Sequence, residues 1–228
     1  MPQDAVTAVV LAAGQGARLG AGRNKVFLEV AGRPLLWHAL RAFIAEPDVG
    51  ELVLVAKPGE EAAATDVAAT LGREVRVVRG GTRRQDSALA GAEAATGRIV
   101  LVHDGARPFP SRDLIRRVLE GARRHGACAP VVAAVHTLRY VDQQRFLKPG
   151  AVARQGLFEM QTPQGFEREA LVLLLREAQG ELPDDAEALL AAGTPVFTVP
   201  GEAWNLKVTT RDDLRVAEAL AGLLSHGG

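Results

Sequence analysis

Apolar runs that alternate with helix-like stretches dominate the first 135 residues. Five such runs are typical of strands buried on both faces of a parallel sheet, and they span 5–13, 51–56, 74–78, 98–103 and 128–135. The stretches between them predict helices that begin at Pro34 and that cover 58–71, 83–95 and 111–125. Pro34 suits a first helical turn, and Ser111 suits an N-cap. The alternation predicts an α/β fold with a doubly wound, mostly parallel sheet and helices on both faces.

The alternation breaks over residues 136–156, a polar stretch without a helical period. An irregular insert of this length in a compact domain is usually functional or engaged with a partner. The regular pattern then resumes, with helices expected over 166–178, 184–192 and 211–224 and a strand over 195–200. Since α/β domains often exceed 200 residues, we expect a single domain, 1–228, with one insertion.

Charge and composition exclude several classes of protein. The 228 residues hold 27 Lys+Arg and 27 Asp+Glu, so the formal net charge is zero, and without a basic excess we expect no nucleic-acid partner. No apolar run approaches the roughly 20 residues that cross a bilayer, and the first residues lack the basic segment of a signal peptide. We therefore expect no membrane association. The single Cys128 fits a reducing cytoplasm.

Lysine is scarce in this sequence, so each lysine is a candidate for a specific functional contact. Only four of the 27 basic residues are Lys: Lys25, Lys57, Lys148 and Lys207. A compact ammonium and a planar guanidinium are not interchangeable, so a retained lysine points to a specific contact or to chance. The local sequence around each lysine has to decide between these two readings.

The loop after the first strand combines small residues with positive charge. Ligands of open α/β sheets bind beyond the carboxyl ends of the strands, and residues 11–25 hold four glycines and three cations there. Small residues let backbone N–H groups approach a phosphate, which the cations neutralise. The dinucleotide fingerprint is absent because its third glycine position is Leu19, and no Gly-Lys is followed by Ser or Thr. Nucleotide binding by another loop type is favoured over a merely flexible loop.

Three further clusters suit a small phosphorylated ligand. Residues 80–87 offer two glycines and polar side chains that either read a base edge or cap a helix. Asp104 and Arg107 follow the fourth strand. Asp104 could hold a metal ion or a sugar hydroxyl while Arg107 binds a phosphate. Alternatively, the two residues pair with each other and only shape the turn. The fourth cluster, 204–210, contains Lys207. No second His or Cys lies at metal spacing from His103, which argues against zinc.

With these motifs in order, the chain resembles the 2-C-methyl-D-erythritol 4-phosphate cytidylyltransferase family. The resemblance spans nearly the whole chain. It rests on the LAAGxGxR segment that leads to Lys25, the GG…DS segment over 80–87, VLVHDGARP over 100–108, Thr137, RQGL over 154–157, TPQ over 162–164 and NLKVTT from Asn205.

The resemblance implies a Rossmann-like nucleotidyltransferase fold with a protruding dimerisation arm, formed by the insert at about 136–156. It implies transfer of a cytidylyl group from CTP to 2-C-methyl-D-erythritol 4-phosphate, with Mg²⁺ bound alongside CTP, in non-mevalonate isoprenoid biosynthesis. The products are 4-diphosphocytidyl-2-C-methyl-D-erythritol and pyrophosphate. The attacking phosphate oxygen is already ionised at pH 7, so catalysis consists of positioning and charge neutralisation.

The resemblance also implies a role for each matched residue. Arg18 and Lys25 stabilise the transition state. The nucleotide is held by Ala12, Ala13, Gly14, Gly16, Gly81, Thr82 and Ser87. The polyol phosphate faces Asp104, Gly105, Arg107, Thr137, Arg154 and Lys207. The protein is implied to be a homodimer in which the arm, with Thr137 and Arg154, reaches the active site of the partner, and no metal ligand is assigned.

Departures from the family pattern leave the acceptor open. Asn24 replaces a usual Pro, Thr82 and Trp204 each replace a usual Asp, and Pro183 replaces a usual Thr. Trp204 and Pro183 are expected near the polyol, so another polyol phosphate such as ribitol 5-phosphate is the alternative acceptor. An inactive nucleotide-binding module is the alternative from another class, and the retained catalytic cations argue against it.

Overall fold

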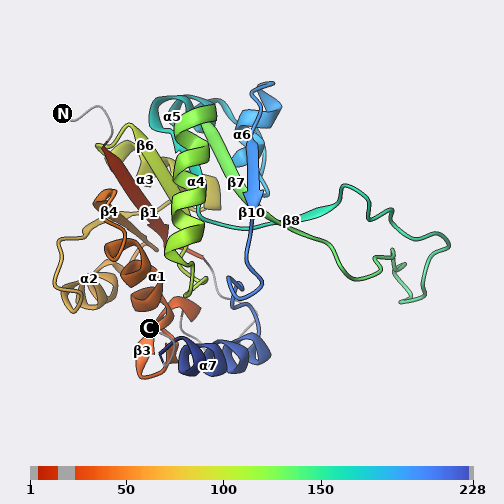
Figure 1. The fold of residues 1–228 in the computed structure, drawn as a ribbon, viewed down its shortest axis with the longest axis horizontal. Coiled ribbons are helices and arrows are strands. Elements are labelled where there is room, and N and C mark those ends of the chain that lie inside the picture. The colour runs from red at the N-terminus through yellow and green to blue at the C-terminus, as the bar shows by residue number, and fades with distance from the viewer. Residues whose placement is uncertain (1–4, 15–23, 226–228) are drawn as a thin grey trace.

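The computed structural model describes residues 5–14 and 24–225 and contains a mixed eight-stranded sheet flanked by helices (Figure 1). Seven strands lie in the order β10-β7-β9-β6-β1-β4-β5, and β8 pairs with β7. The strands are β1 Val6–Leu11, β4 Val49–Ala56, β5 Arg76–Arg79, β6 Ile99–Asp104, β7 Ala127–Ala133, β8 Phe158–Met160, β9 Gln164–Glu167 and β10 Phe197–Pro200. A separate antiparallel pair joins β2 Glu29–Val30 to β3 Arg33–Pro34.

Strand β1 lies between two parallel partners, β4 and β6, and its last residue Leu11 stands opposite Val55 and Asp104. The β4–β5 and β7–β10 pairs are also parallel, whereas β8 and β9 run antiparallel to their neighbours. The predicted doubly wound, mostly parallel sheet is confirmed. Because β1, β4, β5 and β6 are parallel, the loops that leave their carboxyl ends converge at one edge.

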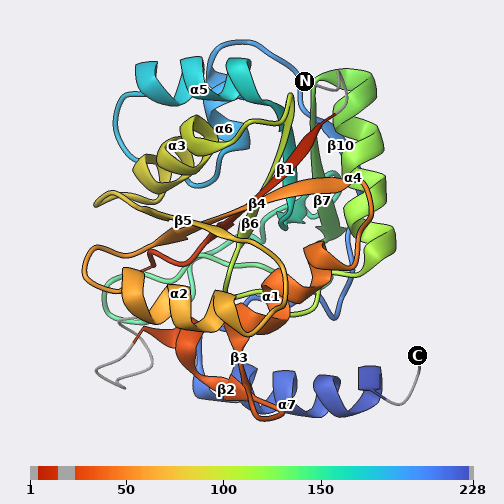
Figure 2. The same ribbon diagram turned by 90° about the vertical axis from the view of Figure 1, so that its left-hand side faces the viewer.

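Helices cover both faces of the sheet, as Figure 2 shows. One face carries α1 Leu35–Ile44, α2 Glu61–Ala69 and α4 Arg112–His125; the other carries α3 Arg84–Ala94, α5 Arg168–Glu177 and α6 Ala186–Ala191. Helix α7 Arg211–Ser225 lies outside these layers and packs beside β2, with Ala217 and Ala221 against Val30 and Leu35. Among the described residues no helix is both long and apolar enough to cross a membrane.

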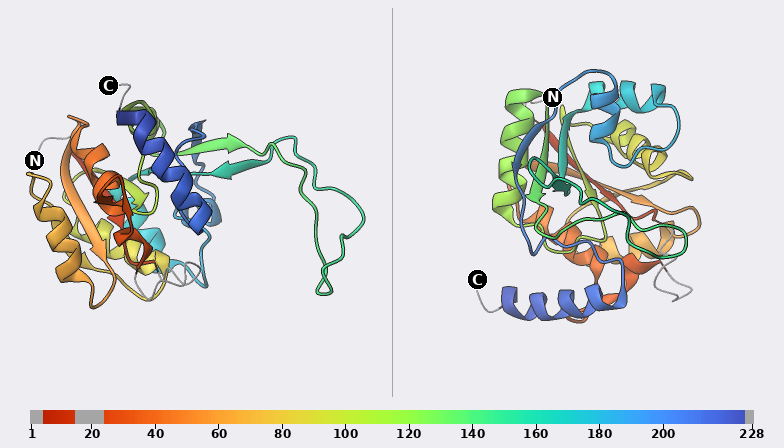
Figure 3. Two further views of the ribbon diagram at one scale, coloured as in Figure 1. Left: turned by 90° about the horizontal axis from the view of Figure 1, so that it is seen from below. Right: turned by 90° about the vertical axis from the view of Figure 1, so that its right-hand side faces the viewer.

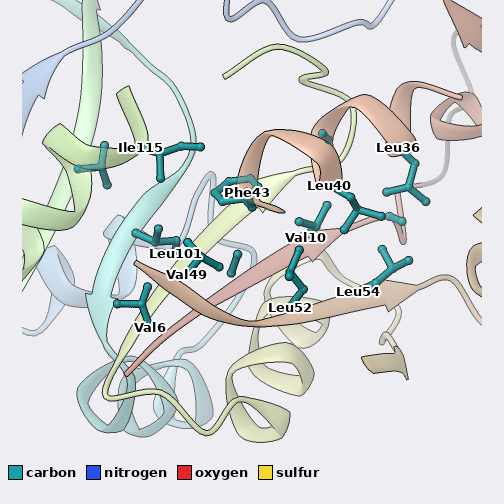
Figure 4. Close-up of a cluster of buried hydrophobic side chains, with 14 of the residues drawn as sticks. Val6, Val10, Leu36, Leu40, Phe43, Val49, Leu52, Leu54, Leu101 and Ile115 are labelled. Atoms are coloured by element: carbon teal, nitrogen blue, oxygen red, sulfur yellow. The ribbon is translucent and has the colours of Figure 1, made fainter. Parts of the chain in front are cut away.

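The larger core lies between the sheet and α1, α2 and α4 (Figure 4). Leu52, Leu54 and Leu101 of the strands are fully buried there, as are Leu40 and Phe43 of α1. Each such side chain contributes about 1.5–3 kcal/mol through its removal from water. The opposite face of the same strands is also buried, which explains why their sequences read as apolar runs rather than as alternating patterns.

Helix α4 begins and ends as its sequence predicts. The Ser111 hydroxyl accepts a hydrogen bond from the Leu114 N–H at 3.0 Å, which confirms the expected N-cap. The same hydroxyl donates to Glu202 at 2.6 Å, so the cap also joins the helix to the segment before α7. Gly126 ends the helix with φ of 81°, a conformation that favours glycine.

The helix expected over 166–178 is wrong at its start. Phe166 belongs to β9, where it stands antiparallel to Val100 and Ala127, and α5 begins only at Arg168. Strand β9 has four residues and leads directly into the helix, so it is too short to show an alternating pattern of its own. Strand β8 was likewise not expected, because its three residues are all exposed.

The insert forms an arm, residues 134–157, that extends away from the sheet between β7 and β8 (Figures 1 and 3). Its two limbs are joined by backbone hydrogen bonds from Val152 to Leu138 at 3.0 Å and from Lys148 to Tyr140 at 2.8 Å. Large apolar side chains are exposed along it, including Tyr140 at 68% and Phe146 at 70%. Exposed apolar surface of this kind is typical of an interaction site.

Candidate active site

A pocket of about 510 Å³ opens where β1 and β6 end and α3 begins. It is lined by segments that are far apart in the sequence but meet at the carboxyl edge of the sheet. The lining residues are Leu11, Ala13, Gly14, Lys25, Val26, Thr82, Arg83, Arg84, Gln85, Ser87, Asp104, Ala106, Glu181, Leu182, Lys207 and Thr209. The four predicted clusters therefore form one site.

Lys25 reaches this pocket from a single 3-10 turn, Lys25–Phe27, which Asn24 caps. The buried Asn24 amide donates to the Ala12 carbonyl and to the Glu60 carboxylate, each at 2.7 Å, and accepts from the Val26 N–H at 3.3 Å. These three bonds hold the turn together and tie it to the end of β1 and to the start of α2, which fixes where Lys25 leaves the backbone.

The loop before α3 packs closely against the first turn of that helix, and its Thr82 lines the pocket. A Cβ on Gly81 would lie 2.3 Å from the Cβ of Asp86, so only glycine fits there. The Gly81 N–H donates to the Ser87 hydroxyl at 3.2 Å, and the Thr82 hydroxyl donates to Asp86 at 3.2 Å. Thr82 and Ser87 thus present hydroxyl groups at the pocket wall in an arrangement that is already hydrogen-bonded.

Asp104 is the centre of charge in the pocket. Its Oδ2 lies 2.7 Å from the Lys207 ammonium and 3.8 Å from Nε of Arg107, and its Oδ1 lies 3.3 Å from Nη2 of Arg84. Burial alone would raise the pKa of Asp104, but Arg84 and Lys207 outweigh it and hold the pKa well below its usual range. The carboxylate is therefore ionised at neutral pH and orients the cations around it.

His103 and Thr162 hold the end of β6 in place. The backbone N–H of Asp104 donates to the Thr162 hydroxyl at 3.1 Å, and His103 Nε2 lies 2.9 Å from the Arg107 carbonyl. Nε2 must carry the proton, so Nδ1 accepts from the Thr162 hydroxyl at 3.1 Å. Burial lowers the pKa of His103 to about 4. His103 is thus a neutral, buried, hydrogen-bonded residue.

Two residues of the loop after β6, Gly105 and Arg107, do not line the pocket. Arg107 donates to the carbonyl of Asn205 at 2.7 Å and to that of Met160 at 3.3 Å, which joins the loop to neighbouring segments. The Gly105 N–H donates to the Leu11 carbonyl at 2.9 Å. A Cβ on Gly105 would lie 2.9 Å from that same oxygen, which explains the glycine.

The two arm residues and Trp204 lie outside the pocket lining. Thr137 and Arg154 are in the arm and do not line the pocket, and the Arg154 guanidinium donates to the Val135 carbonyl. Trp204 lies in a separate groove beside Phe109 and α7 and does not line the pocket. Its neighbour Lys207 points the other way, into the pocket. Gly16 and Arg18 lie outside the described residues.

Arg84, Glu181 and Leu182 were not predicted as site residues, although Pro183, in the same segment 178–185, was expected near the polyol. Arg84 belongs to the GG…DS cluster over 80–87, and no feature of the sequence distinguishes it from its neighbour Arg83. In the structure its Nη1 donates to the buried Asp185 at 2.8 Å, while Glu181 and Leu182 of the segment line the pocket. Burial raises the pKa of Asp185, and the nearby charge of Arg84 offsets this effect only in part, so the pKa stays above its usual value.

The model of the 2-C-methyl-D-erythritol 4-phosphate cytidylyltransferase family matches residues 6–222. The chain belongs to this family. It is 41% identical to the 2-C-methyl-D-erythritol 4-phosphate cytidylyltransferase of Thermus thermophilus, over 96% of this chain and 99% of that protein. The crystal structure of a Thermus thermophilus cytidylyltransferase superimposes with a TM-score of 0.80 at 38% identity and covers 94% of this chain and 98% of that one.

Some relatives in the family are longer. A bifunctional enzyme IspD/IspF of Solidesulfovibrio magneticus is 41% identical over 93% of this chain, and one of Anaeromyxobacter is 40% identical over 96%. The chain spans 56% and 58% of the length of these two proteins. The fold is also shared at lower identity, since a 4-diphosphocytidyl-2C-methyl-D-erythritol synthase of Anaerococcus prevotii superimposes with a TM-score of 0.83 at 26% identity.

In this member of the family the pocket favours an anionic ligand. Lys25 and Lys207 both line it. Asp104 is surrounded by Arg84, Arg107 and Lys207, and these three cations contact only two carboxylates, Asp104 and Asp185. The group therefore has a net charge of +1. Such a field stabilises negative charge that builds up on a phosphate. Neutral hydroxyls from Thr82 and Ser87 on the other wall can bond to the rest of a nucleotide.

Proposed function

We propose that the chain transfers the cytidylyl group of CTP to 2-C-methyl-D-erythritol 4-phosphate, giving 4-diphosphocytidyl-2-C-methyl-D-erythritol and pyrophosphate. The observation that carries the proposal is that Lys25, Lys207 and Asp104, from three of the four predicted clusters, meet in one pocket. Family membership supplies the identity of the substrates. The reaction is a step of non-mevalonate isoprenoid synthesis.

The reaction needs charge neutralisation more than proton transfer. An oxygen of the polyol phosphate attacks the α-phosphorus of CTP, a new P–O bond forms, and the bond from that phosphorus to the bridging oxygen of pyrophosphate breaks. The attacking oxygen is ionised at pH 7, so no base is required. Lys25, together with Arg18, neutralises charge on the α-phosphate and on the leaving pyrophosphate.

We assign the two ends of the pocket to the two substrates. The nucleotide binds along the first loop and the start of α3, through Ala12, Ala13, Gly14, Gly16, Gly81, Thr82 and Ser87. The polyol phosphate binds near Lys207 and Asp104. Gly105 and Arg107 shape that end from behind the wall, since their described bonds go to the backbone of neighbouring segments.

Mg²⁺ enters this proposal with the nucleotide. Among the described residues no group of three His, Cys, Asp or Glu side chains is placed to hold a metal ion, and Asp104 is already engaged by cations. A resident magnesium site made by the protein therefore does not fit these residues. Mg²⁺ commonly keeps most of its ligands from phosphates and water, which matches delivery as a complex with CTP.

We further propose that the chain is one nucleotidyltransferase domain, works in the cytoplasm, and acts as a homodimer in which each arm serves the active site of the partner. The support for the dimer is the exposed apolar surface of the arm and the distance of Thr137 and Arg154 from the pocket walls of their own chain. The support for the location is that Cys128 is the only cysteine of the sequence, which fits a reducing compartment.

Subunit mixing tests the arm exchange. Chains with Lys25→Ala and chains with Arg154→Ala are unfolded, mixed in equal amounts and refolded, and turnover is measured at low polyol phosphate. In a mixed dimer one site combines an intact pocket with an intact arm, so we expect about a quarter of wild-type activity from the mixture. Activity no higher than that of the separate variants would show that each arm serves its own chain.

Pyrophosphate release tests the reaction itself. Purified protein is given each of four nucleoside triphosphates with 2-C-methyl-D-erythritol 4-phosphate or with ribitol 5-phosphate. We expect kcat/KM to be highest for CTP with the methylerythritol phosphate. Faster release with ribitol 5-phosphate would establish the alternative acceptor. CTP binding without pyrophosphate release from any pair would establish the inactive binding module.

A further inference from the structure

The Arg84 guanidinium bridges two carboxylates that come from different parts of the chain. Its Nη1 donates to Asp185 Oδ1 at 2.8 Å, and its Nε and Nη2 face Asp104 Oδ1 at 3.4 and 3.3 Å. Arg84 is the first residue of α3, so the start of this helix is joined both to the end of β6 and to the segment 178–185. A planar group with several fixed donors can make both contacts at once.

Asp104 passes this constraint on to Lys207. Arg84 engages Oδ1 of the carboxylate, whereas the Lys207 ammonium lies 2.7 Å from Oδ2. The Lys207 side chain is 39% exposed and lines the pocket, and a flexible four-carbon stem has many rotamers to choose from. With one oxygen held by Arg84, the carboxylate presents the other oxygen in a fixed direction and so fixes the ammonium.

Arg84 also stabilises a buried charge. Asp185 is fully buried, and among the ion pairs of the described residues it takes part only in the pair with Arg84. Gln85 adds two bonds to the same segment, to the Gly180 carbonyl at 2.8 Å and from the Leu182 N–H at 2.9 Å. Loss of the Arg84 charge would leave Asp185 without a cation, which is costly in a buried site.

We propose that Arg84 is a positioning residue that acts through Asp104 to orient the Lys207 ammonium toward the phosphate of the polyol substrate. The inference rests on the proposed function, since it concerns the same pocket. Without Arg84, Asp104 is free to turn both oxygens to its other cations and to draw Lys207 back from the substrate. The competing explanation is that Arg84 only neutralises Asp185 and so only stabilises the fold.

A double-mutant cycle separates these two roles. Arg84→Gln, Lys207→Met and the double variant are compared by KM for methylerythritol phosphate, KM for CTP and kcat. We expect Arg84→Gln to raise the KM for the polyol phosphate about tenfold or more, and the KM for CTP much less, because a charged contact is lost. In the double variant we expect a KM close to that of Lys207→Met alone, since the path through Lys207 is already broken. Effects that multiply would overturn the proposal.

Arg84→Lys provides the second variant, in case Arg84→Gln does not fold. A lysine keeps the charge near Asp185 but cannot bridge both carboxylates. We expect it to recover much of the thermal stability while the KM for the polyol phosphate stays raised. A wild-type KM in Arg84→Lys would mean that charge alone suffices, and the positioning role would be refuted.

Arg176→Gln is the matched control. Arg176 also bonds to a carboxylate of α3, since its Nη2 donates to Glu93 Oε1 at 2.6 Å. Glu93 lies near the end of the helix that is far from the pocket. We expect wild-type KM values from this variant, and a rise equal to that of Arg84→Gln would overturn the proposal. The wild type is assayed in parallel: no turnover would refute the proposed function and this inference with it, whereas turnover with an unaffected Arg84→Gln would refute the inference alone.

Discussion

At the scale of single residues, the pocket depends on groups whose ionisation the fold controls. Asp104 stays charged because cations surround it, and His103 stays neutral because it is buried beside Thr162. The sequence identified Asp104 and Lys25 as site residues because their types and positions matched a known pattern. It could not identify Arg84, because its partner Asp185 is 101 residues away and the pairing depends on how the segment 178–185 packs.

His103 makes the stability of the fold sensitive to acid. Its pKa is about 4 in the folded protein because it is buried, against about 6.5 in an unfolded chain. Between pH 6.5 and pH 4, His103 is therefore protonated in the unfolded chain but remains neutral in the folded protein. We expect the contribution of neutral His103 to the free energy of unfolding to be fully present above pH 6.5. It should fall by about 2 kcal/mol between pH 7 and pH 5.

Urea unfolding at the two pH values measures this loss. His103→Gln keeps a group that can donate to the Arg107 carbonyl but removes the titration. We expect the variant to lose about 2 kcal/mol less than the wild type between pH 7 and pH 5. An equal loss in both proteins would mean that another group is responsible.

Lys25 is expected to act on the transition state rather than on the fold. We expect Lys25→Ala to lower kcat by about 10²–10³-fold or more, because it removes a charge directed at the reacting phosphates. Circular dichroism and the thermal midpoint should stay close to those of the wild type, since Asn24 anchors the turn through its own bonds. Lys57→Ala, at a lysine outside the pocket lining, is the matched control. A near-normal kcat in Lys25→Ala would remove Lys25 from the mechanism.

At the scale of elements, the sequence predicted helices α1 to α7 and strands β1, β4, β5, β6, β7 and β10, but not strands β2, β3, β8 and β9. Strands β1, β4 and β6 are buried on both faces, so their sequences are long apolar runs that are typical of buried strands. Strands β8 and β9 have three and four residues, and what makes them strands is pairing with β6 and β7 rather than any local pattern. The arm was predicted as an insert because it lacks a pattern, yet its hairpin form follows from contacts between its own limbs.

The arm carries a prediction of its own. We expect Arg154→Ala to raise the KM for the polyol phosphate about 10–100-fold, as loss of a charged hydrogen bond would, and to change the KM for CTP little. Steady-state kinetics with each substrate varied in turn measures both values. Equal increases in the two KM values would contradict the assignment of Arg154 to the polyol phosphate.

At the scale of the whole molecule, the order of the strands explains why the motifs meet. Residues 11–25, 80–87 and 104–107 each follow a parallel strand, and 204–210 is tied to the third of these loops where the Val208 N–H donates to the Ala106 carbonyl at 2.9 Å. The parallel topology that the sequence predicted is what brings the first three together. The approach of Lys207 to the pocket, and the position of Trp204 in a separate groove, depend on the packing of α7 and its preceding segment against β2.

Transfer of isotope from the acceptor tests the central claim most directly. Methylerythritol phosphate with ¹⁸O at its non-bridging phosphate oxygens is incubated with CTP and the wild-type protein, and both products are analysed by mass spectrometry. If an oxygen of the polyol phosphate attacks the α-phosphorus, all of the label must stay in the cytidine diphosphate product, and the pyrophosphate must be unlabelled. Label in the pyrophosphate, or no nucleotide product at all, would contradict the account.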